Sequence, residues 1–194
     1  MILRGAALLE RLRSIPSADR DAWVDDLLAI GAPPPDVALP RGAVPYLPCG
    51  VDEIITAILE APVRDSDVLV DLGSGLGRVA ILGHLLSGAR TWGIEIQEHL
   101  VERARARVSE LQLDDVSFIH GNAEDIVLDG SVFFLYAPFN GPMLARVVEQ
   151  LEHVARRRPI IVCAVHLELH DIAWLAARPS SCGALTIYDS VFAR

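Results

Sequence analysis

The sequence predicts an α/β protein with a doubly wound, mostly parallel Rossmann-like sheet of about six or seven strands, helices on both faces and an N-terminal helical extension. Three observations predict this fold class. Short β-branched runs alternate with helical or loop stretches after Val63. Apolar residues make up 52% of the chain and are spread over many short runs, which indicates a packed core. A length of 194 residues allows one α/β domain with a modest extension and is too short for two ordinary domains.

The N-terminal part is predicted to contain a helix followed by an extended connector. Ser17 is a suitable cap for a helix that runs through Ile30, and Gly31 is a suitable terminator. Proline lacks a backbone N–H and fixes φ, so a run of prolines excludes a regular helix or a central strand. The connector contains six of them: Pro33, Pro34, Pro35, Pro40, Pro45 and Pro48.

Residues 1–62 are therefore expected to form a helical extension and connector that covers the site, and residues 63–194 to form the ligand-binding core. Further helices are expected over Val51–Glu60, over Gln97–Leu111 and after Pro142, each with one apolar face. The expected strands are Val68–Asp71, Thr91–Ile96, Val116–His120, Val132–Tyr136, Ile160–Val165 and Leu185–Phe192.

The turn after the first predicted strand carries the strongest functional signal. It contains Asp71 at the end of the strand, followed by Gly73, Ser74, Gly75 and Gly77. Ligands bind at the carboxyl ends of strands in such sheets, and glycines let the backbone come close to them. A dinucleotide site favours G-x-G-x-x-G, with a helix N-terminus at the pyrophosphate. The spacing G-x-G-x-G after an aspartate instead indicates a ligand that carries an ammonium group.

Glu95 is the second part of the predicted site. It ends the next strand, about 20 residues beyond the loop, where a carboxylate can accept hydrogen bonds from both hydroxyls of a ribose. The loop and the acid together predict a nucleoside-containing cofactor at this edge of the sheet.

These motifs resemble those of the class I S-adenosylmethionine-dependent methyltransferase family, whose first motif is an acidic residue followed by alternating glycines. The resemblance spans roughly residues 44–165 and implies that the cofactor is S-adenosylmethionine. Asn122 stands where an aspartate is more usual, and its amide oxygen can still accept a hydrogen bond from the adenine amine. The implied cofactor-binding residues are Asp71, Gly73, Ser74, Gly75, Gly77, Glu95, Ile96, Asn122, Ala123 and Tyr136.

The segment after the fourth predicted strand is similar to the place where family members that methylate nitrogen often carry a polar residue, a proline and an aromatic. Here it reads Ala137-Pro138-Phe139, so the polar residue is missing. The resemblance implies a nitrogen acceptor on a protein side chain or a small metabolite. The candidate catalytic residues are Tyr136, Phe139, Asn140 and His166.

Each of these candidates has an alternative role. Tyr136 and Phe139 form either an aromatic wall for a cation or a packed strand end. Asn140 either orients a substrate or caps the next helix. His166 is a candidate general base just past the fifth predicted strand, or an ordinary surface residue. With Glu168, His170 and Asp171 it also forms a conceivable metal cluster, but no metal site is predicted.

The connector contains the segment Tyr46-Leu47-Pro48. Together with Asp71–Arg78 and Tyr136–Phe139, it resembles the branch that contains Dot1-like protein lysine methyltransferases and related bacterial proteins of unknown substrate. Tyr46 is expected either to fold over the cofactor as a lid or to pack against the core.

Charge and composition restrict the partners. A net charge of −9 argues against nucleic acid as the main substrate, so the methyl acceptor is expected to be a protein or a small molecule. Three widely spaced cysteines and the lack of a long apolar run indicate reduced thiols, no membrane association and a cytoplasmic location. Two alternatives stay open: a catalytically silent subunit that binds S-adenosylmethionine, and an NAD-dependent oxidoreductase on the same kind of sheet.

Overall fold

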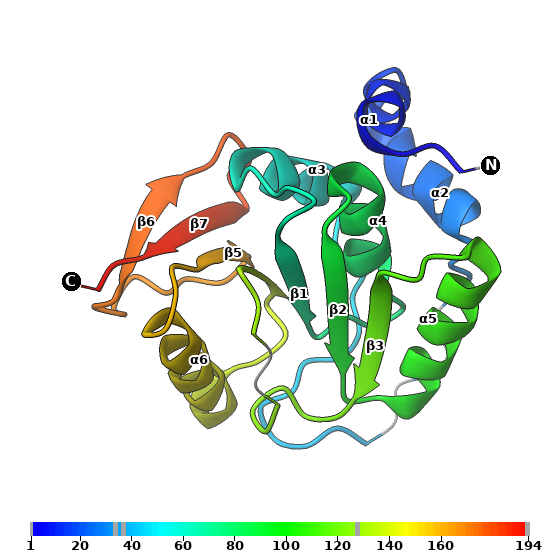
Figure 1. The fold of residues 1–194 in the computed structure, drawn as a ribbon. Helices are drawn as coiled ribbons and strands as arrows, with labels where there is room; N and C mark the ends of the chain where they lie inside the picture. The colour runs from blue at the N-terminus through cyan, green and yellow to red at the C-terminus, as the bar shows by residue number, and fades with distance from the viewer. Residues whose placement is uncertain (1, 33–34, 36–37, 127–128, 193–194) are drawn as a thin grey trace.

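The structure, a computed structural model, describes residues 2–32, 35, 38–126 and 129–192; Pro33 and Pro34 of the predicted connector lie outside them. The helices, labelled in Figure 1, are α1 (Gly5–Arg13), α2 (Ser17–Leu28), α3 (Val51–Glu60), α4 (Arg78–Ser87), α5 (Glu98–Leu111) and α6 (Gly141–Ala155). The strands are β1 (Val68–Leu72), β2 (Arg90–Glu95), β3 (Val116–His120), β4 (Val132–Tyr136), β5 (Ile161–Val165), β6 (Leu175–Pro179) and β7 (Leu185–Ser190). In this part of the chain, no helix is both long and apolar enough to span a bilayer.

The strands form one seven-stranded sheet in the order β3-β2-β1-β4-β5-β7-β6. Strands β1 to β5 are parallel, and β7 runs antiparallel to both of its neighbours, β5 and β6. The strand order reverses between β1 and β4, which is where open α/β sheets bind ligands. The predicted fold class, a doubly wound and mostly parallel sheet, is confirmed.

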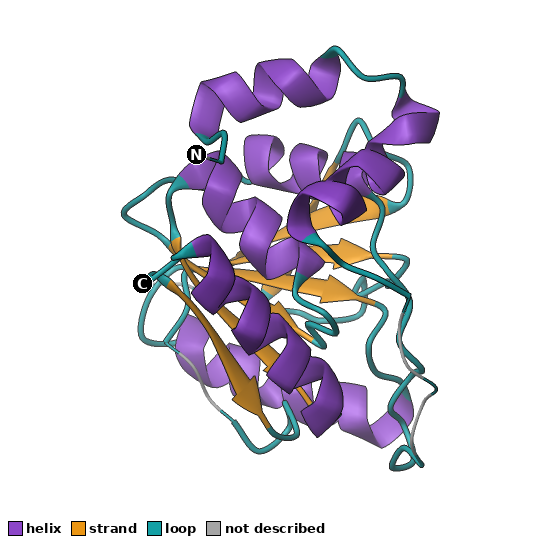
Figure 2. Cartoon of the chain, turned by 90° about the vertical axis from the view of Figure 1, so that its right-hand side faces the viewer, coloured by secondary structure: helices purple, strands orange, loops and turns teal. Residues whose placement is uncertain are grey.

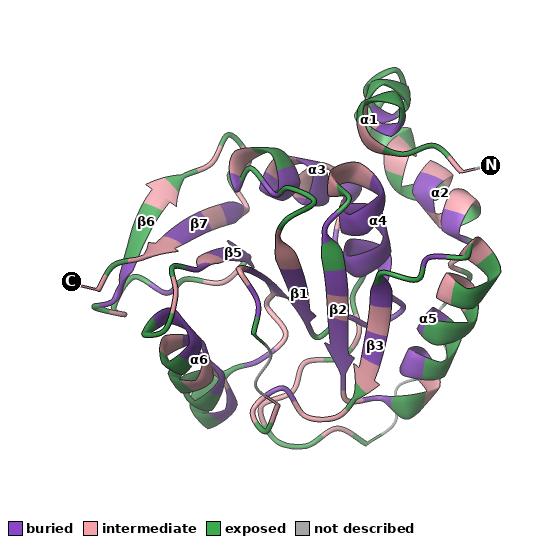
Figure 3. Cartoon of the chain, viewed as in Figure 1, coloured by how far each residue is buried: buried purple, intermediate pink, exposed green. Residues whose placement is uncertain are grey.

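Helices cover both faces of the sheet, but unequally (Figure 2). The side chains of each strand alternate between the faces, so Phe134 of β4 packs in the cluster that includes α3, α4 and α5, whereas Phe133 and Leu135 pack against α6. Among the described residues, α6 is the only helix in the second cluster. The central strands are largely buried and the outer side of α5 is exposed (Figure 3).

The N-terminal helices differ from the prediction at their ends. Pro16, not Ser17, holds the N-cap position of α2, and the Ser17 hydroxyl donates a hydrogen bond to Asp52 instead. The helix ends at Leu28 because Ala29 adopts a left-handed conformation with φ 46°, so Gly31 is not its terminator. Helix α1 was not predicted, whereas α3 has its predicted bounds.

The edge strand β6 was also not predicted. Its sequence, Leu-Ala-Ala-Arg-Pro, has no β-branched residue and ends in a proline, which is tolerated there because an edge strand can leave a backbone position unpaired. The other predicted core elements match the observed bounds to within one or two residues.

Candidate functional site

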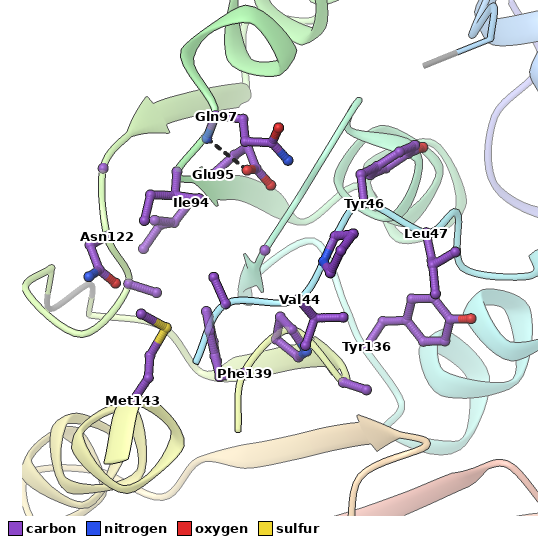
Figure 4. A pocket seen from close by; sticks show the side chains of 18 of the residues that line it. Val44, Tyr46, Leu47, Ile94, Glu95, Gln97, Asn122, Tyr136, Phe139 and Met143 are labelled. Atoms are coloured by element: carbon purple, nitrogen blue, oxygen red, sulfur yellow. Dashed lines mark hydrogen bonds between the residues drawn. The ribbon is translucent and has the colours of Figure 1, made fainter. Parts of the chain in front are cut away.

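A cavity of about 360 Å³ lies at the carboxyl ends of β1, β2, β4 and β5, a size typical of small-molecule sites. Figure 4 shows Asn122 and Met143 toward one end and Tyr136 and Leu47 toward the other. Of the predicted site residues, those that line it are Gly73, Glu95, Ile96, Asn122, Ala123, Tyr136, Phe139 and His166. The lining residues that the sequence analysis did not single out for the site include Val44, Ile94, Gln97 and Met143.

Glu95 is held in place by the glycine loop. Only 7% of the residue is exposed, and each carboxylate oxygen accepts one backbone hydrogen bond. Oε2 accepts from the N–H of Gly75 at 2.9 Å, and Oε1 from that of Gln97 at 2.8 Å, the bond drawn in Figure 4. These bonds join the loop after β1 to the end of β2, and each oxygen keeps lone pairs for a further donor.

Asp71 lies beside the main cavity rather than in its wall. It lines an adjoining cavity of about 20 Å³, together with Ser74, Tyr46 and Tyr136. The residue is 2% exposed, and its Oδ2 has no hydrogen-bond partner among the described residues. Burial, with a smaller contribution from the negative charge of Glu95, raises the pKa of Asp71 to about 8. A buried carboxylate with one unpaired oxygen favours a cationic neighbour.

The other loop glycines contact protein groups. At Gly75, with φ 52°, a Cβ atom would lie 2.1 Å from Cε2 of Tyr46, so the tyrosine ring sits directly over the loop. At Gly77, with φ 86°, it would lie 2.5 Å from Phe118. Glycine therefore has two roles at these positions. It permits the left-handed backbone conformation, and it leaves room for Tyr46 and Phe118 to pack against the loop.

The connector forms one wall of the cavity. Ala43 and Phe139 form an isolated antiparallel bridge, and the N–H of Val44 donates to the carbonyl of Pro138 at 3.2 Å. Burial raises the pKa of Tyr46 to about 12, so its hydroxyl stays neutral near pH 7. The connector and the segment after β4 thus lie side by side over the sheet edge.

Two non-glycine residues at adjacent strand ends have left-handed backbones. Ala137 follows β4 with φ 39°, and His166 follows β5 with φ 51°. Both line the cavity, and the rings of His166 and Tyr136 lie 5.8 Å apart between centroids. Such conformations are uncommon and concentrate at functional sites. Burial also raises the pKa of Tyr136.

Asn140 is not brought into the site. It is exposed, lies outside the cavity lining and occupies the N-cap position of α6 without a side-chain capping bond. Its backbone N–H donates to the carbonyl of Gly42 at 2.9 Å. The position is that of a cap, as one alternative held, but the capping bond itself is absent.

Asn122 lines the cavity with its amide partly engaged. Its Nδ2 donates to Glu124 at 2.7 Å, and its Oδ1 accepts from the Glu124 N–H at 3.2 Å. The amide oxygen keeps a lone pair for a further donor. Within the described part of the chain, no group of three or more His, Cys, Asp or Glu residues is placed to hold a metal ion.

Comparison with known proteins finds methyltransferases. Residues 64–135 match the family described as "Methyltransferase domain". An RNA methyltransferase from Salinibacter ruber, solved in complex with S-adenosyl-L-homocysteine, has 27% identity and a TM-score of 0.59, with 74% of this chain and 92% of that chain covered.

Two curated relatives are also methyltransferases by name. The ribosomal protein L11 methyltransferase of Fusobacterium nucleatum is 18% identical over 111 residues, 56% of this chain and 36% of that protein. A probable cobalt-precorrin-6B C(15)-methyltransferase (decarboxylating) of Sulfurisphaera tokodaii is 31% identical over 85 residues, 42% of this chain and 44% of that protein. The chain spans less than half the length of these curated relatives.

Proposed function

We propose that this chain is a class I S-adenosylmethionine-dependent methyltransferase and that it transfers the methyl group to a nitrogen of a protein side chain or a small metabolite. The observation that carries the choice of cofactor is the pair of buried carboxylates near the ends of β1 and β2, and the nitrogen acceptor rests on the resemblance of Pro138-Phe139. Among the described residues Oδ2 of Asp71 has no hydrogen-bond partner, and Glu95 lines the cavity. An amino-acid-bearing nucleoside supplies the donors that both need.

The residues present fit this cofactor. Asp71 is suited to the ammonium group, because a cation beside a buried carboxylate offsets its desolvation. Glu95 is suited to the ribose hydroxyls, and Asn122 to the adenine edge. We propose the other predicted cofactor residues, Gly73, Ser74, Gly75, Gly77, Ile96 and Ala123, as the backbone and apolar parts of the same site.

Methyl transfer from a sulfonium needs few catalytic side chains. The cofactor supplies a methyl group on a sulfonium sulfur that leaves as a neutral thioether, so no acid is needed. Tyr136 and Phe139 would form an aromatic wall that holds an amine in line, since aligning the reactants supplies most of the catalysis. His166 is exposed at the cavity edge beside Tyr136 and would accept the proton that the amine loses. Asn140 is not included.

Residues 1–62 would complete the site as its cover. The bridge from Ala43 to Phe139 and the position of the Tyr46 ring over Gly75 support this role. Leu47, 62% exposed at the cavity, would then face the acceptor.

Calorimetric titration with S-adenosylhomocysteine tests the donor site. Glu95→Ala removes the acceptor for two backbone donors and for the ribose, and is expected to weaken binding about tenfold or more. Glu98→Ala, three residues away and exposed, is the matched control and should leave the affinity unchanged. Equal affinities for Glu95→Ala and the wild type would contradict the proposed site.

The second candidate function is a catalytically silent subunit that binds the cofactor. Ala137 favours it, because a side chain that hydrogen-bonds the acceptor is absent there. Incubation with methyl-labelled cofactor and a lysate of the source cells, followed by size separation, distinguishes the two. Label on a protein or small-molecule fraction supports transfer, and no transferred label supports the silent subunit.

A further inference from the structure

A groove of about 750 Å³ lies beside the proposed active site, between α6 and the segment that follows β5. The same two segments line both hollows. Phe139 and Met143 line the cavity while Gly141 and Leu144 line the groove, and His166 lines the cavity while residues 168–172 line the groove. Because the rings of His166 and Tyr136 are neighbours, the segment after β5 brings the groove next to the Tyr136 end of the cavity, where the acceptor is proposed to bind.

The floor of the groove is apolar and its walls are fixed. Leu144 and Val148 of α6 line it together with Leu169 and Ile172, and all four are buried or half-buried. The N–H of Leu169 donates to the hydroxyl of Tyr188 at 2.9 Å, and that of His166 donates to the carbonyl of Ala184 at 2.8 Å. Because Tyr188 is fully buried in the sheet, this wall is anchored to the core. A pre-formed surface of this kind loses little entropy when a partner binds.

The rim of the groove is negative. Glu149, Glu168 and Asp171 line it and are exposed, whereas the described lining contains neither lysine nor arginine. Within the described residues, no ion pair involves any of these three carboxylates. An apolar floor with unpaired carboxylates at its edge is complementary to a chain that carries both aliphatic and cationic side chains, and it repels a phosphate backbone.

We propose that this groove binds a basic, aliphatic segment of a protein substrate and holds it beside the acceptor side of the cavity. The inference rests on the proposed function and narrows its acceptor from a protein or metabolite to a protein. The groove supplies the apolar contact, the rim selects positive charge, and the shared walls direct one side chain of the segment toward His166.

The sequence offers an unusually clean test, because it contains no lysine: all 17 of its Lys and Arg residues are arginine. A carbodiimide joins carboxylates to amines, so this protein cannot cross-link to itself through lysine. The probe is an eight-residue peptide of alternating Lys and Leu, acetylated and amidated at its ends. Its amines are then the main partners for the enzyme's carboxylates, and mass spectrometry of the product locates the carboxylate that each one reached.

The expected result is cross-linking at Glu149, Glu168 or Asp171. In fluorescence anisotropy the double variant Glu149→Lys/Glu168→Lys should bind the peptide at least tenfold more weakly. Glu102→Lys, an exposed reversal on α5, should bind like the wild type. A peptide with Glu in place of Lys, and single-stranded oligouridine, should not compete.

Several results overturn the proposal: no peptide binding by the wild type, cross-links only elsewhere, equal binding by the double variant, or competition by the acidic peptide or the RNA. Titration of the same samples with S-adenosylhomocysteine separates this failure from that of the proposed function. Cofactor binding without peptide binding would refute only the proposed role of the groove. Peptide binding without cofactor binding would refute the proposed function.

Discussion

Asp71 and Glu95 end neighbouring parallel strands, yet they have different surroundings. The carboxylate oxygens of Glu95 each accept a backbone N–H, whereas one oxygen of Asp71 has no partner among the described residues and the charge of Glu95 contributes to the raised pKa of Asp71. The two carboxyl groups therefore have different roles in the site. Glu95 holds the glycine loop through its two backbone hydrogen bonds, whereas Asp71 favours its protonated form and would become charged beside the ammonium group of the proposed cofactor.

The raised pKa of Asp71 predicts a pH-dependent stability. The pKa of Asp71 is about 8 in the folded protein against 3.8 for an aspartate exposed to water, so the folded state holds this proton more tightly than the unfolded state. The contribution of Asp71 to the free energy of unfolding is therefore fully present below about pH 4 and is lost as the pH rises toward about 8. Asp71→Asn removes the titration, and its denaturation midpoint is expected to fall less than that of the wild type between about pH 5 and pH 8.

The measurement is thermal denaturation of both proteins across this range, because groups that titrate alike in both cancel in the difference. A constant difference between the two midpoints at every pH would show that Asp71 does not titrate there. Saturating S-adenosylhomocysteine should flatten the wild-type slope, since its ammonium group favours the charged carboxylate.

At the scale of elements, the start of α4 joins the extension to the core. Arg78, 4% exposed, donates to the carbonyl of Cys49 at 2.8 Å and to Asp25 of α2 at 2.5 Å. Asp21, also on α2, lies 3.7 Å from Arg78 and accepts the N–H of Val51 at the start of α3. One buried guanidinium thus fixes α2 and the end of the connector beside the glycine loop.

Removing Asp25 is expected to weaken the attachment of residues 1–62 to the core. Asp25→Ala leaves the Arg78 guanidinium buried without its nearest anion, which should lower the free energy of unfolding by about 2 kcal/mol. Asp26→Ala is the control, because Asp26 is the exposed neighbour on the same helix. Urea denaturation measures both, and equal midpoints for the two variants would contradict the role of Asp25.

The features that were predicted depend on residues close together in the sequence, whereas those that were missed depend on contacts between distant segments. The glycine loop and Glu95 could be read from the sequence because a strand end and a spacing along the chain define them. The bridge from Ala43 to Phe139 and the contact of Tyr46 with Gly75 join segments far apart in sequence, and no local pattern marks them. Ser17 had the chemistry of a cap, but Asp52 of another helix took its hydroxyl, a case of tertiary contact overriding local preference.

At the scale of the whole molecule, the proposed cofactor site is assembled from β1, β2, β4, β5 and the connector, so a ligand in it stabilises the fold as a unit. A ligand at a hundredfold over its dissociation constant stabilises by about 2.7 kcal/mol. For a chain of 194 residues this raises the melting temperature by roughly 5–10 °C. We expect that shift with S-adenosylhomocysteine and none with NAD, because the G-x-G-x-G spacing and the buried Asp71 suit an ammonium group and oppose a pyrophosphate. Glu95→Ala should reduce the shift at the same ligand concentration. An equal shift with NAD would favour the oxidoreductase alternative, since the sheet alone supports either chemistry and only the loop and its two carboxylates distinguish them.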